Sequence, residues 1–267
     1  ARYRGVALWM LNDRIELEEA ERQLRGFGEA GWGAIITRTY MGTRITYLSE
    51  EWLALLERIL RVSREQGTTV FLQEADTKVG GYVTTALLGM EDRYRHHRLV
   101  MAPAGEAPPP QSALLAAAGG DAFYDQMVVP RGAAREFFAV MDLLDEETVR
   151  AFMQRCYQAQ ADYHQEDFGG VIEAIWMDEP FLRFYHDSRL PVLPWTPRLP
   201  ELFQRDWGYP LLEHLPSLFR EVGDFRRVRH QFWRTVVAQF KRAYWQPIGR
   251  WCGEQGVKFA GHLMGED

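Results

Sequence analysis

The sequence predicts an α/β fold of the (β/α)8 TIM-barrel type, with only about five strand–helix units present. Five short apolar runs, each followed by polar residues, lie at 6–11, 33–37, 69–72, 171–177 and 257–262. Stretches with helical spacing separate most of these runs, so successive strands should be parallel and joined by right-handed crossovers. The runs are apolar throughout, which is typical of parallel strands covered on both faces. A closed barrel needs eight strands, so these units would form part of one.

The first two units have the clearest boundaries. The run 6–11 stops at Asn12, and an amphipathic stretch then continues to about Gly31. Ser49 is a predicted N-cap for the next helix, because its hydroxyl can accept a hydrogen bond from the first turn. That helix should stop at residues 66–67, directly before the third run.

The regular alternation breaks between residues 78 and 139. This segment contains the proline run 108–110 and short β-like pieces at 98–101 and 137–140. It predicts a β-rich insertion of hairpins and loops standing over one end of the barrel. The whole chain, 1–267, is otherwise expected to be a single partial-barrel catalytic domain.

Helical periodicity returns at Asp145, a predicted N-cap for a helix that continues to about Phe168. An irregular excursion rich in Pro and Trp follows the fourth run, around 193–210. A long helix from about Phe225 to Trp251 then leads to the fifth run.

Composition excludes several classes of protein. A net charge of -6 and a pI near 5.7 argue against nucleic acid as the main partner, because phosphate binding needs a basic surface. No apolar run is long enough to span a membrane, and the first residues lack the hydrophobic region of a signal peptide, so the cytoplasm is the default location. Cys156 and Cys252 have no metal-ligand spacing and are expected to be free thiols, although two cysteines leave one bridge open. We predict no metal and no cofactor.

Polar residues stand at the ends of all five predicted strands, where barrels bind their ligands. Each of them alone is more readily explained as an ordinary loop residue, but five ends meeting at one mouth form a stronger pattern. Clustered carboxylates repel one another unless a proton, a cation or a polar ligand offsets their charge. The residues are Asn12, Arg38, Tyr40, Glu74, Asp76, Asp178, Glu179, His262 and Glu266.

Glu179 is the strongest candidate for a catalytic acid. It follows an apolar strand next to Asp178, and Pro180 should restrict its backbone to an extended conformation. A carboxyl group beside a like charge, at the edge of an apolar barrel, is expected to have a raised pKa, as a general acid requires. A carboxylate at the start of a helix, with Pro180 in the first turn, explains the same residues equally well.

A glycosidase needs a second carboxylate, about 5 Å from the acid in a retaining enzyme and roughly 6.5–9.5 Å in an inverting one. Glu266 is one candidate, since the fifth strand should lie beside the fourth. Glu74 and Asp76, after the third run, are others. Glu266 is alternatively a flexible terminal acid.

Other chemistries lack their motifs. No His-x-His follows the first strand, so a metal-dependent amidohydrolase is disfavoured, and His96 and His97 lie in the insertion, where we expect them at the surface. There is no Gly-x-Ser-x-Gly elbow and no phosphate-binding glycine loop after the first strand.

The order of several short motifs resembles that of bacterial glycoside hydrolases of the α-L-rhamnosidase type, family 106 and its relatives. These motifs are an aromatic-rich first strand ending in Asn, a Tyr-Leu-Ser-x-x-Trp segment, Asp-Glu-Pro after the fourth strand, a Pro-Trp-Thr segment, a Gly-Tyr…Leu-Phe stretch, and the fifth strand. They occupy residues 8–12, 47–52, 178–180, 194–196, 208–219 and 259–263. The resemblance is weakest from 78 to 138.

The resemblance implies a glycoside hydrolase with Glu179 as general acid and Glu266 as partner carboxylate. The residues expected to bind the sugar are Asn12, Trp9, Arg38, Tyr40, Glu74, Asp76, Asp178 and His262. Residues 73–77 depart from the family pattern, which bears on the substrate class. Relatives can hold calcium near the site, but no ligand set here is specific enough to predict one.

Two alternatives stay open at this point. The chain could be a non-catalytic carbohydrate-binding barrel, or an inactive truncated fragment of a hydrolase that folds only with partner subunits. The expected partners are an oligosaccharide or glycoconjugate and, because an incomplete barrel exposes its sheet edges, a second copy of the chain.

Overall fold

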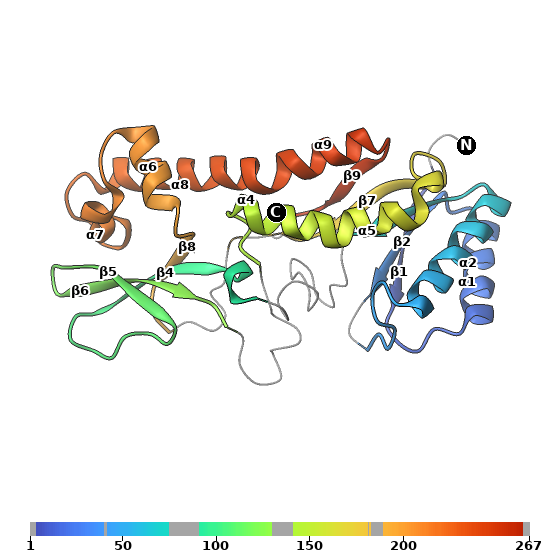
Figure 1. Cartoon of the computed structure of the whole chain (residues 1–267), viewed down its shortest axis with the longest axis horizontal. Coiled ribbons are helices and arrows are strands. Elements are labelled where there is room, and N and C mark those ends of the chain that lie inside the picture. Colours follow the sequence, from blue (N-terminus) through green and yellow to red (C-terminus); the bar gives the residue numbers. More distant parts are fainter. Residues whose placement is uncertain are drawn as a thin grey trace.

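A five-stranded parallel sheet forms one end of the structure (Figure 1). The computed structural model describes residues 4–39, 42–74, 91–129, 141–180, 182 and 189–263. The strands are neighbours in the order β1-β2-β3-β7-β9, and every neighbouring pair is parallel. Their bounds are β1 (Val6–Leu11), β2 (Ala34–Thr39), β3 (Thr69–Gln73), β7 (Ile172–Asp178) and β9 (Lys258–His262). The five predicted runs are therefore the five strands of one sheet.

Helices connect these strands and cover one face of the sheet. The apolar core between helices and strands includes Trp9 and Leu11 of β1, together with Leu24 and Leu56 from the helices. The connecting elements are α1 (Leu17–Glu29), α2 (Glu50–Gln66), η1 (Asp92–Tyr94), α4 (Glu146–Phe152), η3 (Met153–Gln158), α5 (Ala159–His164), η4 (Gln165–Asp167), α8 (Phe225–Phe240), η6 (Lys241–Trp245) and α9 (Gln246–Glu254). The segments η3 and η6 are π-helical turns inside the two long helices.

The other face of the sheet is less well covered. On β1, alternate side chains point to opposite faces. Trp9 and Leu11 are buried among the helices, whereas Val6 and Leu8 are 39% and 44% exposed. Within the described residues β1 and β9 are the outer strands of an open sheet. The structure is thus a mixed α/β architecture with a parallel sheet, and its five predicted strands form an open sheet that is not a clear TIM barrel.

A separate antiparallel sheet lies at the opposite end of the long axis (Figure 1). It has the strand order β5-β6-β4-β8. Its strands are β4 (His97–Pro103), β5 (Ser112–Ala118), β6 (Asp121–Met127) and β8 (Val192–Trp195). Three of them come from the predicted insertion. The fourth, β8, comes from the excursion expected to be irregular, and the predicted β piece at 137–140 lies outside the described residues.

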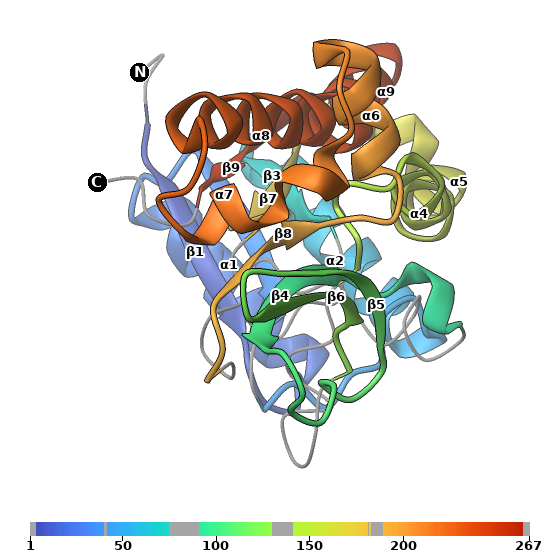
Figure 2. The same cartoon turned by 90° about the vertical axis from the view of Figure 1, so that its left-hand side faces the viewer.

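The antiparallel sheet has its own apolar core, formed with helices that follow β8. These are α6 (Leu199–Trp207), η5 (Leu211–His214) and α7 (Leu215–Phe219), which pack beside the first half of α8 (Figure 2). The long helix 225–254 joins the two cores, because Phe232 and Val236 belong to this one while Tyr244 and Ile248 belong to the core of the parallel sheet.

Both predicted N-caps are confirmed. The Ser49 hydroxyl accepts from the backbone N–H of Trp52 at 3.2 Å, and the Asp145 carboxylate accepts from that of Thr148 at 2.8 Å. Each cap satisfies a backbone donor that the first helical turn leaves unpaired. The helix starts read from the sequence are therefore correct at these two positions.

Two further expectations concern the class of protein. Cys156 and Cys252 are buried free thiols, as predicted. Among the described residues, none of the helices combines the length and the apolar character needed to cross a membrane. The cytoplasmic location and the absence of nucleic acid stay predictions.

Ser49→Ala should lower the free energy of unfolding by about 1 kcal/mol, because the Trp52 N–H then loses its partner. Urea denaturation followed by circular dichroism measures this. Ser49→Asp, which can also cap, should cost much less. Equal losses in the two variants would contradict a capping role.

Candidate functional site

Three strand ends bring four charged or titratable side chains together on the less covered face of the parallel sheet. Arg38 lies at the end of β2, Asp178 ends β7, and His262 ends β9 in register with Asp178. Glu179 follows Asp178 directly. These four residues, predicted from strand ends alone, are adjacent in the structure.

Asp178 is at the centre of this cluster. Its side chain is 1% exposed, it forms an ion pair with Arg38, and its Oδ1 lies 3.0 Å from Nε2 of His262. A buried carboxylate is stable only when charge and hydrogen bonds replace the water it loses. Arg38 and His262 supply that replacement, so Asp178 does not act on Glu179 as the bare like charge that the sequence suggested.

Glu179 has an unusual backbone and a partly accessible side chain. Its φ is +52°, in the left-handed region that non-glycine residues seldom adopt. Its N–H donates to the carbonyl of His262 at 3.1 Å, and its Oε1 lies 3.6 Å from Nδ1 of that histidine. The prediction of an extended conformation before Pro180 is therefore wrong, because the hydrogen bond from the Glu179 N–H to His262 of β9 stabilises a left-handed turn at Glu179. Neither Glu179 nor Pro180 is helical, which also disfavours the helix-start explanation.

A glycine allows β9 to approach β7 closely at this point. A Cβ on Gly261 would lie 2.2 Å from the carbonyl oxygen of Met177, and its φ of +150° also disfavours other residues. The neighbouring residue, His262, is thereby kept within reach of Asp178.

Trp176 is part of this cluster, although it was not predicted. Its ring lies 5.7 Å from that of His262 between centroids, and its buried indole N–H has no partner among the described residues. Trp176 stands two positions before Asp178 on the same strand, so strand periodicity alone places both side chains on one face. That spacing was the signal available in the sequence.

Glu74 lies behind the cluster, between the helices. It is 2% exposed, and its Oε2 accepts from the hydroxyls of Tyr157 and Tyr244 at 2.7 and 2.8 Å. Burial raises the pKa of Glu74 to about 7, although these two hydroxyls and the backbone N–H of Asp178 act in the opposite direction. Glu74 is thus enclosed by protein and is not in the open part of the site.

The remaining predicted residues are dispersed or undescribed. Trp9 points the other way, into the helical core, and its indole donates to Gln23 at 2.8 Å, so the structure does not bring it to the cluster. Asn12 is exposed at the end of β1. Tyr40, Asp76 and Glu266 lie outside the described residues.

The two insertion histidines differ from expectation. His96 is 1% exposed, and His97 Nδ1 lies 2.6 Å from the Asp125 carboxylate. The expected surface location is wrong because both side chains are built into the antiparallel sheet. No group of three or more potential metal ligands occurs within the described ranges.

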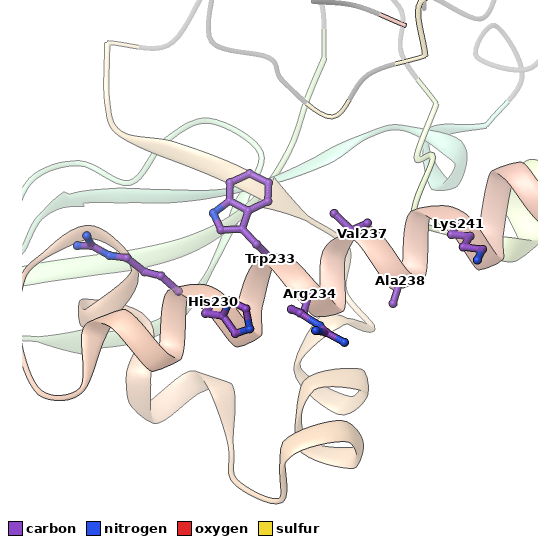
Figure 3. Close-up of a pocket in the computed structure, with 7 residues that line it drawn as sticks. His230, Trp233, Arg234, Val237, Ala238 and Lys241 are labelled. Atoms are coloured by element: carbon purple, nitrogen blue, oxygen red, sulfur yellow. The ribbon is translucent and has the colours of Figure 1, made fainter. Parts of the chain in front are cut away.

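A hollow on the surface of α8 is distinct from this cluster (Figure 3). Trp233 and Val237, one turn apart and both exposed, lie along the helix within it. The described residues that line it are Arg229, His230, Trp233, Arg234, Val237, Ala238 and Lys241, and none of these side chains is a carboxylate that could act as an acid.

Comparison with known proteins shows a likeness in structure but none in sequence. No model of a known protein family matches the chain, and no curated protein sequence matches it. Among solved structures, the chain is similar to a rhamnosidase from Novosphingobium sp. PP1Y, with a TM-score of 0.65 and 9% sequence identity over 97% of the chain. The match covers 46% of the rhamnosidase, so the chain spans about half the length of that protein. At this identity the likeness shows a shared fold.

Arg38→Met should lower the free energy of unfolding by about 3 kcal/mol or more, because it leaves the Asp178 charge buried with one partner fewer. Adding Asp178→Asn should recover part of the loss. Arg220→Met, which removes an exposed partner of Asp121, is the control and should change stability by less than about 1 kcal/mol. Urea unfolding of the four proteins measures these differences, and similar losses in the two single variants would contradict the buried ion pair.

Stability should fall as pH rises from about 4.5 to 7, because the folded state holds a proton on Glu74 over a range where the unfolded chain releases it. Glu74→Gln cannot titrate and should reduce this loss by about 3 kcal/mol, the equivalent of the pKa difference. Asp142, whose pKa burial raises to about 7, titrates over the same range and leaves a residual slope. Unfolding free energies at pH 5 and pH 7.5 test this, and an unchanged slope in Glu74→Gln would count against it.

Proposed function

We propose that this chain is part of a (β/α)8-barrel glycoside hydrolase of the rhamnosidase type, with Glu179 as its general acid. The observation that carries the proposal is the cluster of Arg38, Asp178, Glu179 and His262 at the carboxyl ends of parallel strands. Barrel enzymes place their catalytic groups there. The likeness in fold to a rhamnosidase supports the same class.

The open sheet supports the barrel part of the proposal. β1 and β9 are its outer strands, and Val6 and Leu8 expose apolar surface on the face that a barrel would enclose. Three more parallel strands between β9 and β1 would cover that surface. Without them, the chain should self-associate through these edges, which sedimentation at several concentrations can detect.

His262 lies between Asp178 and Glu179. Its Nε2 is 3.0 Å from Asp178 Oδ1, and its Nδ1 is 3.6 Å from Glu179 Oε1. As general acid, Glu179 would give its proton to the glycosidic oxygen, so that the leaving group departs as an alcohol. The His262 ring beside it would orient the carboxylate that remains.

The second carboxylate of the pair is proposed to be Glu266, which follows β9 by four residues. A retaining enzyme would use it as nucleophile, and an inverting enzyme as the base that activates water. The substrate would be an oligosaccharide or glycoconjugate. Trp176, on the same face as Asp178, supplies an aromatic surface near the cluster.

A non-catalytic carbohydrate-binding barrel is the second candidate. Of the carboxylates in the cluster and directly behind it, Asp178 and Glu74 are buried and bonded, so Glu179 is the accessible carboxylate of the cluster. One accessible acid can bind a sugar hydroxyl but cannot by itself complete a paired mechanism.

Glu179→Gln distinguishes the two. A hydrolase should lose at least about 100-fold in kcat on aryl glycosides, because a general acid contributes roughly that much. The panel should begin with an aryl α-L-rhamnoside, and sugar affinity should survive the substitution. A chain that binds sugars but has no turnover before substitution is a binder.

Glu173→Gln is the matched control for this test. Glu173 lies at the other end of β7, bound to Lys258 and Thr69. Its substitution should leave turnover within about twofold of the unsubstituted chain. An equal loss in both variants would show that the effect comes from damage to β7.

A further inference from the structure

Two π-helical turns bring two buried tyrosines to one carboxyl group directly behind the cluster. η3 interrupts the helix of α4 and α5 and carries Tyr157, and η6 interrupts the helix of α8 and α9 and carries Tyr244. A π turn holds more residues than an α turn, so it rotates side chains to positions a regular helix would not give, and such turns often occur at functional sites.

The geometry around Glu74 is convergent. The Tyr157 and Tyr244 hydroxyls both donate to Oε2, at 2.7 and 2.8 Å, and both tyrosines are 0% exposed. The two helices are held together nearby, where Arg242 Nε donates to Glu146 at 3.0 Å. The carboxyl group is therefore fixed by two rigid elements.

Glu74 is connected in turn to the backbone of the cluster. The backbone N–H of Asp178 faces the Glu74 carboxyl group and lowers its pKa, and the N–H of Glu74 donates to the Trp176 carbonyl at 2.9 Å. The next N–H along the chain, that of Glu179, donates to the His262 carbonyl at 3.1 Å. The left-handed turn at Glu179 is thus flanked on one side by Glu74 and bonded on the other side to β9.

A purely structural role does not require this arrangement. An apolar side chain could fill the same place in the core without the cost of desolvating a carboxyl group. A polar network whose members are all bonded instead specifies one backbone position. The backbone it specifies here is that of the residue preceding Glu179.

We propose that Glu74, oriented by Tyr157 and Tyr244, is a positioning residue that holds the Asp178–Glu179 turn in the geometry required for proton transfer. This inference rests on the proposed function of Glu179. The tyrosines act through Glu74 and touch no substrate.

The test removes one hydroxyl at a time while keeping each ring, in Tyr157→Phe, Tyr244→Phe and the double variant. The double variant should lower kcat about 10-fold to 100-fold with KM unchanged, since small displacements of a catalytic group have effects of that size. It should also shift the pH profile of kcat. Exchange of the Asp178 amide hydrogen should become faster, as measured by mass spectrometry on the peptide that contains β7.

Tyr94→Phe is the matched control. Tyr94 is a buried tyrosine of the same core, and its hydroxyl accepts from Arg93 and does not contact Glu74. Its substitution should change stability as the test variants do, but leave the pH profile and the exchange of β7 unchanged.

Three outcomes are distinguishable. If the unsubstituted chain turns over aryl glycosides and Glu179→Gln abolishes this, but the double variant behaves like Tyr94→Phe, the positioning role is overturned and the proposed function stands. If the unsubstituted chain has no turnover, the proposed function fails and the positioning role fails with it. A selective loss of kcat, a shifted pH profile and faster Asp178 exchange together establish the role.

Discussion

The site depends on how one buried negative charge is neutralised. Asp178 has almost no contact with solvent, yet it ends a strand of the parallel sheet beside Glu179. Arg38 from β2 and His262 from β9 supply the opposing charge and the hydrogen bond, so the contacts of Asp178 depend on the register of the strands on both sides of β7. The same histidine lies 3.6 Å from Glu179, so the surroundings of Glu179 depend on the same sheet.

The sequence predicted most of the parallel sheet, because strands buried on both faces leave apolar runs of strand length. The cap at Ser49 was predictable for a similar reason, since it depends on a local hydrogen bond. The strand β8 was not, because its partner β4 lies about 90 residues earlier in the chain and one of its own four residues is a proline. The closed barrel was an extrapolation from the five units, and the described strands form an open sheet.

The sequence predicted which residues form the candidate site better than it predicted how their side chains and backbone are arranged. Treating every strand end as one cluster grouped Trp9 and Glu74 with Asp178, although successive residues of a strand face opposite ways. Because of that alternation, Glu74 and Trp9 face away from the Asp178 side chain, whereas Trp176 lies on the same face as Asp178. The backbone of Glu179 could not be predicted, because a hydrogen bond to His262, 83 positions later, overrides the local preference set by Pro180.

The long helical segment from Phe225 to Glu254, formed by α8, η6 and α9, has a mechanical consequence. Its first half packs in the core of the antiparallel sheet and its second half packs in the core of the parallel sheet. The helix therefore connects the two cores rigidly. A hinge motion of one sheet against the other would have to bend this helix or pull its side chains out of one of the two cores. The two sheets should therefore move as one body.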